Sequence, residues 1–395
     1  MQDPASFQKS LAFLKQCFEA YYNTQKITLP DRFGRREYAF VFFGGKGMLR
    51  HLAFDKKQLF SSFVKERVPQ HAYYSSAYYK TPDAPTMNEK EWMGAELIFD
   101  LDSDHLPGAD AMSFEESLRV VKQEFQKLVF DFLIGDFGFN EKYLELYFSG
   151  GRGYHCHVKD PQVFDLDSNE RREIVDYITA RDLMDDGILR EHAVARAQIQ
   201  GRSFASVKSL RMPSPDEPGW KGRVSRGIID IILDIKNSDN PVDKLKEYGV
   251  SEKDAVNLSM HLSEARLDRI KDGLLDQSKT LRKFFLNRAL RKSAVSLSAG
   301  ETDEPVTCDV KRLIRLPGSL HGKTGLKVVD ISLDKLEEFD PLIDAVVFDD
   351  TLVSAQVTEE TKIVMNHHEF DLDTGKHDVP KYLAVYLVGK KLASM

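Results

Sequence analysis

Apolar residues recur every three or four positions in two segments of the first third of the chain, and this spacing predicts amphipathic helices. The first segment covers residues 7–22. The second begins at Ser113, which forms a capping-box pattern with Glu116, and Gly135 is its predicted stop. Its shared apolar face consists of Leu118, Val121, Phe125, Leu128 and Phe132. We expect this face to pack against a protein core.

Short apolar runs bounded by turn-forming residues predict strands. Four such runs occur before the middle of the chain, at residues 38–43, 96–101, 144–148 and 154–158. The second run leads into acidic residues, and the last two flank a glycine-rich turn that suits a hairpin. These runs are the expected strands of the core.

The pattern changes at about residue 162, and helical periodicity then dominates as far as residue 302, with another helix start at Ser251. Within this segment residues 213–222 are a Pro/Gly-rich loop, and residues 299–305 read as a linker. Strand-like patterns return from Val306 to the C-terminus and include the apolar run 382–388. The sequence therefore predicts a mixed α/β core of residues 1–161 and 303–395, with a mostly helical insertion of residues 162–302.

Composition places the chain among folded, non-membrane proteins. Of its 395 residues, 42% are apolar and 30% are charged, and no apolar run reaches the roughly 20 residues of a membrane-spanning helix. The N-terminus lacks the basic flank and apolar stretch of a secretory signal. Three scattered cysteines, Cys17, Cys156 and Cys308, cannot form a disulfide framework. We therefore expect a reducing, cytoplasmic setting and no membrane partner.

Charge is distributed unevenly along a chain whose net charge is −7. Three basic clusters stand out, and each could bind phosphates. A solvated basic face is the alternative, and for the second and third clusters it fits equally well. The clusters are Lys311, Arg312, Arg315, Lys323 and Lys327; Arg202, Lys208, Arg211, Lys221, Arg223 and Arg226; and Lys279, Arg282, Lys283, Arg288, Arg291 and Lys292. An acidic chain with local basic clusters favours transient rather than tight contact with nucleic acid.

The clearest chemical pattern is Asp100-Leu101-Asp102 at the end of an apolar strand. Residues two apart in a strand face the same side, about 6.5 Å from each other along the chain. Two carboxylates so placed can hold a pair of divalent cations about 3.5–4 Å apart. Mg²⁺ suits an oxygen-only site of this kind, and Mn²⁺ often replaces it. The alternative is a polar strand end in an ordinary turn.

Two further segments carry donors for anions. Residues 147–155 contain three glycines that let backbone amides approach an anion, with Ser149, Arg152 and His155 as side-chain donors. The alternative is a plain hairpin turn with one exposed arginine. Residues 306–325 bring Asp309, which could complete a metal site, and then Arg315 and His321 around a Pro-Gly turn. For His321 the alternative is a core histidine, although its neighbours are small and polar.

Together these motifs resemble the catalytic small subunit of archaeal/eukaryotic-type DNA primases, most closely the archaeal form. The resemblance rests on Asp-x-Asp after a strand, on Ser-Gly-x-Arg-Gly-x-His about fifty residues later, and on the distant Asp-x-x-Arg-Leu-Ile-Arg-x-Pro-x-Ser-Leu-His-Gly-Lys-Thr-Gly. The segment around Arg36 and residues 73–77 also resemble family segments. The helical middle third carries little of the likeness.

The resemblance implies a primase-type core of two sheets flanked by helices. It implies metal ligands at Asp100, Asp102 and Asp309, which would hold two Mg²⁺ or Mn²⁺ ions. It implies nucleotide contacts by a larger set of side chains, which consists of Ser149, Arg152, His155, Arg315, His321 and Arg36. The implied activity is template-dependent synthesis of short primers from nucleoside triphosphates on single-stranded DNA, in a heterodimer with a primase large subunit.

Two other functions fit the same residues. One is a repair or translesion primase-polymerase of the same superfamily, although the residues of the third motif favour the replicative subunit. The other is a catalytically silent nucleic-acid-binding subunit, which would not need all three aspartates. The sequence also departs from the family, because small primase subunits commonly carry a zinc knuckle after the Asp-x-Asp strand. Residues 103–112 contain no cysteine and only His105, so we expect a zinc-free loop there.

Overall fold

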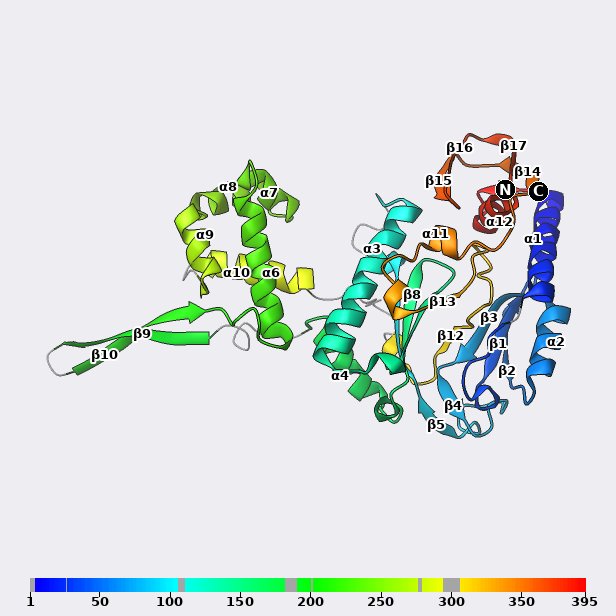
Figure 1. The fold of residues 1–395 in the computed structure, drawn as a ribbon, viewed down its shortest axis with the longest axis horizontal. Helices are drawn as coiled ribbons and strands as arrows, with labels where there is room; N and C mark the ends of the chain where they lie inside the picture. Colours follow the sequence, from blue (N-terminus) through cyan, green and yellow to red (C-terminus); the bar gives the residue numbers. More distant parts are fainter. Residues whose placement is uncertain are drawn as a thin grey trace. The chain divides into compact units, whose positions relative to one another are not determined.

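The structure is a computed structural model that describes residues 4–25, 27–105, 111–181, 190–199, 202–275, 279–293 and 306–395. The chain divides into two compact units, drawn in Figure 1. Unit 1 consists of Met1–Val175 and Ser296–Met395, and unit 2 of Asp176–Val295. Both helices and sheets contribute to the fold, so the predicted mixed α/β class is confirmed.

Unit 1 is built on two four-stranded antiparallel sheets. The first has the order β12-β3-β1-β2, with β1 (Tyr38–Phe42), β2 (Met48–Leu52), β3 (Pro69–Ser75) and β12 (Leu313–Arg315). The second has the order β13-β7-β8-β6, with β6 (Leu97–Asp102), β7 (Leu144–Phe148), β8 (Gly153–Val158) and β13 (Val329–Ile331). The four runs predicted as strands are thus strands, and the late segments β12 and β13 complete sheets begun early in the chain.

Helices pack on the main and small sheets of unit 1, and several of their local signals match the sequence. They are α1 (Pro4–Thr24), α2 (Lys57–Arg67), α3 (Phe114–Gln126), α4 (Ser168–Ile178), α11 (Pro341–Asp344) and α12 (Lys381–Lys390). The Ser113 hydroxyl accepts a hydrogen bond from the Glu116 backbone N–H at 3.1 Å, which confirms the predicted cap. All five residues of the predicted apolar face are buried. A π-helical segment, Lys127–Asp136, continues α3, so the helical backbone ends one residue past Gly135.

The strand expected within the run 382–388 is wrong, because this run lies in helix α12. Every residue from Tyr382 to Val388 is buried, so the run is apolar on all sides of the helix and has no helical periodicity to detect. Helix α12 packs against α1 and against β18 (Ala393–Ser394). The two ends of the chain meet there, as the Met395 backbone N–H donates to the Ser10 hydroxyl at 2.9 Å (Figure 1).

Small sheets complete unit 1. Strands β4 (Ala77–Tyr79) and β5 (Trp92–Ala95) form one pair, and β15 (Thr361–Met365) and β16 (His368–Leu372) another. Strands β14 (Leu352–Val357) and β17 (Gly375–Pro380) join β18 in a three-stranded sheet. These elements lie outside the two main sheets.

Unit 2 is largely helical and also contains a long hairpin that the sequence did not predict. Its helices are α6 (Gly219–Lys236), α7 (Pro241–Glu247), α8 (Glu252–His261), α9 (Glu264–Lys271) and α10 (Lys279–Ser293). The hairpin consists of β9 (Arg190–Ile199) and β10 (Arg202–Arg211). A short third strand, β11 (Leu274–Leu275), pairs with β10. Ser251 caps α8 as predicted, whereas the loop predicted for residues 213–222 ends earlier, because α6 begins at Gly219. The predicted linker, residues 299–305, lies outside the described residues.

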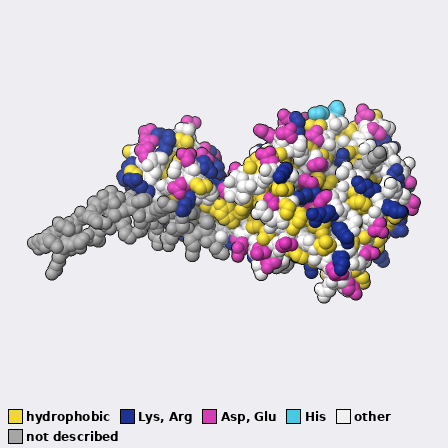
Figure 2. All heavy atoms as spheres, turned by 60° about the horizontal axis from the view of Figure 1, so that its bottom comes forward, with side chains coloured by type: hydrophobic (Ala, Val, Ile, Leu, Met, Phe, Trp, Pro, Cys, Tyr) yellow, Lys and Arg dark blue, Asp and Glu magenta, His cyan; other side chains and the backbone are white. Residues whose placement is uncertain are grey.

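Surface charge is mixed on both units. Figure 2 shows acidic and basic side chains interspersed over the face that it draws, in keeping with the modest net charge of −7. Among the described residues, no helix has the length and hydropathy needed to cross a membrane.

Candidate functional site

A cavity of about 820 Å³ lies in unit 1 where five segments of the chain meet. Its walls come from β3, from the ends of β6 and β8, from the segment around β12 and the loop after it, and from the end of α12. The polar side chains among its lining residues are Gln70, His71, Tyr73, Asp100, Asp102, Ser149, Arg152, His155, Arg312, Arg315, His321, Lys323, Thr324, Lys390 and Lys391. Two carboxylates thus face a set of cationic and neutral donors.

The two carboxylates stand at the end of β6, next to β8. In the strand register Asp100 lies opposite His155 and Asp102 opposite Gly153. The side chains of Asp100 and Asp102 are 23% and 34% exposed, so both can reach a ligand in the cavity. Burial acts to raise the pKa of Asp100, but His155, Arg312 and Arg315 outweigh it, and the net pKa is lowered. Asp100 is therefore held as a carboxylate.

Neighbouring side chains already contact these carboxylates. His155 Nε2 lies 3.2 Å from Asp100 Oδ1, and Arg152 Nε lies 3.5 Å from Asp102 Oδ1. Arg152 also pairs with Asp104. Cations bound at the carboxylates would compete with these pairs and free Arg152 for another anion.

The glycine turn between β7 and β8 is held by Ser149 and by close packing. The Ser149 hydroxyl accepts hydrogen bonds from the backbone N–H groups of Gly151 and Gly153, at 3.2 and 3.3 Å. A Cβ atom at Gly153 would lie 2.0 Å from the Leu101 carbonyl oxygen. Only glycine therefore allows β8 to approach β6 this closely beside Asp102.

The cavity is also lined by two histidines that burial keeps neutral. Burial, with Arg315 and Lys323 nearby, lowers the pKa of His71 to about 3. Its Nδ1 therefore accepts hydrogen bonds, from Arg315 Nη1 at 2.7 Å and from the Gly322 backbone N–H at 3.2 Å. Burial, followed by Arg315 and His71, holds the pKa of His321 well below its usual range.

The hydrogen bonds of Thr324 assign the proton on His321. The Thr324 hydroxyl donates to the Gly150 carbonyl oxygen, so it accepts from His321 Nδ1, which lies 3.1 Å away. The other ring nitrogen, Nε2, then carries a lone pair. It lies against the glycine turn, since a Cβ atom at Gly151 would be 3.2 Å from it.

The end of α12 supplies lysines that sequence reasoning missed. Burial, with Arg152 and Lys323 nearby, lowers the pKa of Lys390. A Cβ atom at Gly389 would lie 2.6 Å from the Lys323 carbonyl oxygen, so glycine is what lets α12 lie against this loop. Lys390 and Lys391 could not be found while their segment was interpreted as a strand. His71 and Gln70 were also missed, because they belong to no motif.

Seven of the nine predicted site residues line this cavity, namely Asp100, Asp102, Ser149, Arg152, His155, Arg315 and His321. Asp309 does not line it. It follows the short 3₁₀ turn η7 (Val306–Cys308), which packs beside β6, and its Oδ1 accepts from the Lys311 backbone N–H at 2.9 Å. Within the described ranges, no three His, Cys, Asp or Glu side chains are arranged to hold a metal ion.

Arg36 lies outside the cavity, fully buried among partners of its own. Its guanidinium donates to the Asp31 carbonyl oxygen at 2.9 Å and to the Ser75 carbonyl oxygen at 2.8 Å, and it pairs with Glu96. Because these bonds occupy donors on all three nitrogens, Arg36 is not placed here to contact a nucleotide directly. Its position gives it a structural role.

The donor set at the strand end fits a divalent cation in type. Carboxylate oxygens are the ligands that Mg²⁺ and Mn²⁺ prefer, and Asp100 and Asp102 are both ionisable, partly exposed and on one strand. The predicted zinc-free loop, by contrast, lies largely outside the described residues, at 106–110, so it stays a prediction.

Comparison with known proteins agrees with the motifs. Residues 99–332 match the family model described as DNA primase small subunit. The chain is 40% identical to the DNA primase small subunit of Methanothrix thermoacetophila, over 98% of this chain and 99% of that protein. It is 39% identical to the corresponding subunit of Methanococcoides burtonii, over 96% and 97% of the two chains. It is 39% identical to the subunit of Picrophilus torridus, over 98% of each chain.

Proposed function

The chain belongs to the DNA primase small subunit family, and we propose that it is the catalytic subunit that makes short primers from nucleoside triphosphates on single-stranded DNA. The family implies a primase enzyme of DNA replication, and the archaeal source of the relatives fits the archaeal resemblance of the motifs. One observation carries the mechanistic part. Two carboxylates and a set of phosphate-binding donors, from distant parts of the chain, line a single cavity.

Asp100 and Asp102 are the proposed ligands of Mg²⁺ or Mn²⁺. When bound, two such ions activate the attacking 3′-hydroxyl and stabilise the leaving pyrophosphate. Asp309 is proposed as a further carboxylate because η7 packs beside β6. Its Oδ1 is engaged by the Lys311 backbone N–H, so a metal-binding role would use Oδ2 or break that bond.

The remaining side chains would hold the triphosphate. Ser149 shapes the glycine turn, while Arg152, His155 and Arg315 present donors to the cavity. Arg152 now pairs with Asp102 and Asp104 and would exchange those partners for phosphate oxygens once cations occupy the carboxylates. Lys323, Lys390 and Lys391 add positive charge to the cavity and would neutralise charge that develops during transfer.

His321 would respond to nucleotide by taking up a proton. Its Nε2 lone pair lies beside the turn, and nearby Arg315 and burial disfavour the imidazolium while the cavity is empty of anions. A triphosphate would offset that positive charge and raise the pKa of His321. The imidazolium could then donate to a phosphate oxygen from Nε2.

The proposed partner is a primase large subunit, and the proposed setting is the cytoplasm, on DNA. The modest net charge leaves little basic surface for gripping a template over a long stretch, which supports a need for a second subunit. Stimulation of primer synthesis by the co-purified large subunit is the expected result.

Primer synthesis on a bare template tests the activity. The chain is incubated with single-stranded DNA, nucleoside triphosphates and Mg²⁺ or Mn²⁺, with and without an annealed primer. New chains without a primer are expected. Extension only from an annealed primer would indicate a repair polymerase of the same superfamily, and no synthesis under either condition would indicate a silent nucleic-acid-binding subunit.

A further inference from the structure

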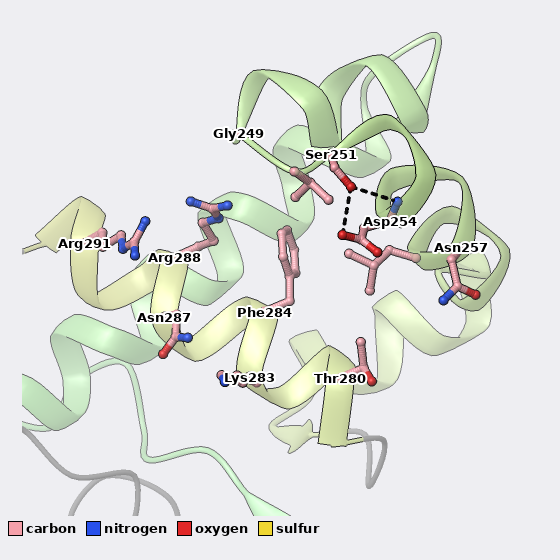
Figure 3. Close-up of a pocket in the computed structure, with 12 residues that line it drawn as sticks. Gly249, Ser251, Asp254, Asn257, Thr280, Lys283, Phe284, Asn287, Arg288 and Arg291 are labelled. Atoms are coloured by element: carbon pink, nitrogen blue, oxygen red, sulfur yellow. Dashed lines mark hydrogen bonds between the residues drawn. The ribbon is translucent and has the colours of Figure 1, made fainter. Parts of the chain in front are cut away.

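Unit 2 contains a cavity of its own, of about 610 Å³, which is separate from the site of unit 1. It lies between α10 and the segment that joins α7 to α8 (Figure 3). Lys283, Arg288 and Arg291 line it from α10, and Arg288 and Arg291 are neighbours on the helix surface because they are three residues apart. These residues belong to the third basic cluster of the sequence, which the proposed catalytic site does not use.

The three cations of the cavity contrast with several other lysines of unit 2, which have an anionic partner. Lys236, Lys244 and Lys246 each form an ion pair with a carboxylate, at 2.7 to 3.2 Å. In the part of the chain that the structure describes, no ion pair forms at Lys283, Arg288 or Arg291. The one carboxylate in the cavity, Asp254, instead accepts a hydrogen bond from the Ser251 hydroxyl at 2.8 Å (Figure 3).

Like charges have been brought together here without compensation. Burial and the nearby Arg291 both lower the pKa of Arg288, which records the repulsion between the two guanidinium groups. A cluster of cations that lines a cavity and has no carboxylate partner attracts anions. A guanidinium offers a planar pair of donors that matches two phosphate oxygens.

The walls favour phosphates over a protein partner. The aromatic ring at the centre, Phe284, is only 9% exposed, and Leu258 is only 5% exposed, so neither offers an apolar anchor of the kind that protein interfaces use. The exposed amide of Asn287 adds a polar contact from the same helix. Because Phe284 is buried, a base cannot stack on it, so binding here should not depend on base sequence.

We propose that the cavity lined by Lys283, Arg288 and Arg291 binds backbone phosphates of a single nucleic-acid strand. This inference rests on the proposed function, because a primase must hold its template strand. The same chemistry would also suit the triphosphate of a free nucleotide, so the experiment separates the two sources.

The test is binding of a labelled single-stranded oligonucleotide of mixed sequence to the full chain, by fluorescence anisotropy, with a chelator present so that no synthesis occurs. The double variant Arg288→Ala/Arg291→Ala is compared with the unchanged chain over a salt series. Each phosphate contact contributes about 0.7 to the slope of log affinity against log salt, so the slope should fall by about 1.4. Equivalently, the advantage of the unchanged chain should grow about sevenfold between about 200 mM and about 50 mM salt.

Two variants serve as controls. Lys292→Ala removes a cation from the same helix, but Lys292 already pairs with Asp230 at 3.5 Å and does not line the cavity, so the slope should stay unchanged. Arg288→Lys/Arg291→Lys keeps the charges and should restore most of the slope, which excludes general unfolding as the cause.

The outcomes separate the rival occupants and the two proposals. An unchanged slope in the double variant overturns the inference, as does a variant that binds the strand normally but loses binding of a free nucleoside triphosphate. A variant that binds DNA normally but no longer associates with the large subunit would assign the cavity to a protein partner instead. Asp100→Asn should bind the strand normally without synthesising primers. If the slope falls as predicted in the double variant but the unchanged chain never synthesises primers, the function proposal fails and the binding site stands.

Discussion

Replacing Gly153 by alanine should damage both the second sheet and the catalytic cavity. The new Cβ would lie 2.0 Å from the Leu101 carbonyl oxygen and 2.9 Å from the Asp102 Cα. Both neighbours are backbone atoms of the paired strand, so no side-chain movement relieves the clash. The strands β6 and β8 must separate where Asp102 and Gly153 face each other, two residues from the pair of Asp100 and His155.

The magnitude follows from two contributions. Overpacking in a well-filled core costs about 1–3 kcal/mol. The hydrogen bond from the Ser149 backbone N–H to the Gly153 carbonyl oxygen, 2.9 Å long, would also be strained, and its loss costs about 1 kcal/mol. We therefore expect unit 1 to lose about 2–4 kcal/mol. At about 2 °C per kcal/mol, its Tm should fall by about 4–8 °C.

Thermal unfolding followed by calorimetry measures this change, with primer synthesis assayed in parallel below the Tm. The matched control is Gly34→Ala, where the new Cβ would meet nothing closer than the Phe54 carbonyl oxygen at 3.8 Å. That control should change the stability by less than about 0.5 kcal/mol and leave synthesis intact. If Gly153→Ala matched the control in Tm and in activity, the close strand pairing that places Asp102 beside the turn would be refuted.

Four further outcomes are expected. Arg152→Ala and His155→Ala should each raise the KM for nucleotide and lower kcat, as measured by steady-state kinetics. Unchanged kinetics in both variants would show that the glycine turn is an ordinary hairpin that does not bind nucleotide. Lys390→Ala should raise the KM for nucleotide without lowering the Tm. A normal KM would show that the end of α12 does not contribute to nucleotide binding. Burial acts to raise the pKa of Glu96, but Arg36 outweighs it and the folded-state pKa is lowered, so this carboxylate stabilises the fold above about pH 4.5 and the contribution is lost on acidification. Glu96→Gln should flatten that part of the stability–pH curve. Because Asp31 still pairs with Arg36 at 2.9 Å, the substitution should cost less than the about 3–5 kcal/mol of a fully unpaired buried charge. Elemental analysis of the purified chain should find no stoichiometric zinc, and one zinc that resists dialysis would contradict the expected zinc-free loop.

Local patterns predicted the part of the site that adjacent strands build. Asp100, Asp102 and the turn carrying Arg152 and His155 occupy neighbouring antiparallel strands, so alternation of side chains is enough to bring them together. The cap at Ser113 was equally readable, because its hydrogen bond spans three residues.

What sequence reasoning missed depends on contacts between distant segments. The run 382–388 is buried on all sides, and burial alone does not distinguish a strand from a helix, so the lysines at the end of α12 went unseen. Arg36 matched a short motif, yet its position is set by buried partners such as Glu96, sixty residues away. Asp309 stays a proposed ligand, since the structure places it beside β6 but not in the cavity.

The central claim is that Asp100 and Asp102 make the cavity of unit 1 a metal-dependent nucleotidyl-transfer site. Release of pyrophosphate from nucleoside triphosphates, measured with single-stranded template and Mg²⁺ or Mn²⁺, tests it most directly. Asp100→Asn and Asp102→Asn should each abolish release while keeping the Tm, and Asp55→Asn, an exposed carboxylate outside the cavity, should release pyrophosphate at the normal rate. Near-normal release from either of the first two variants would contradict the account.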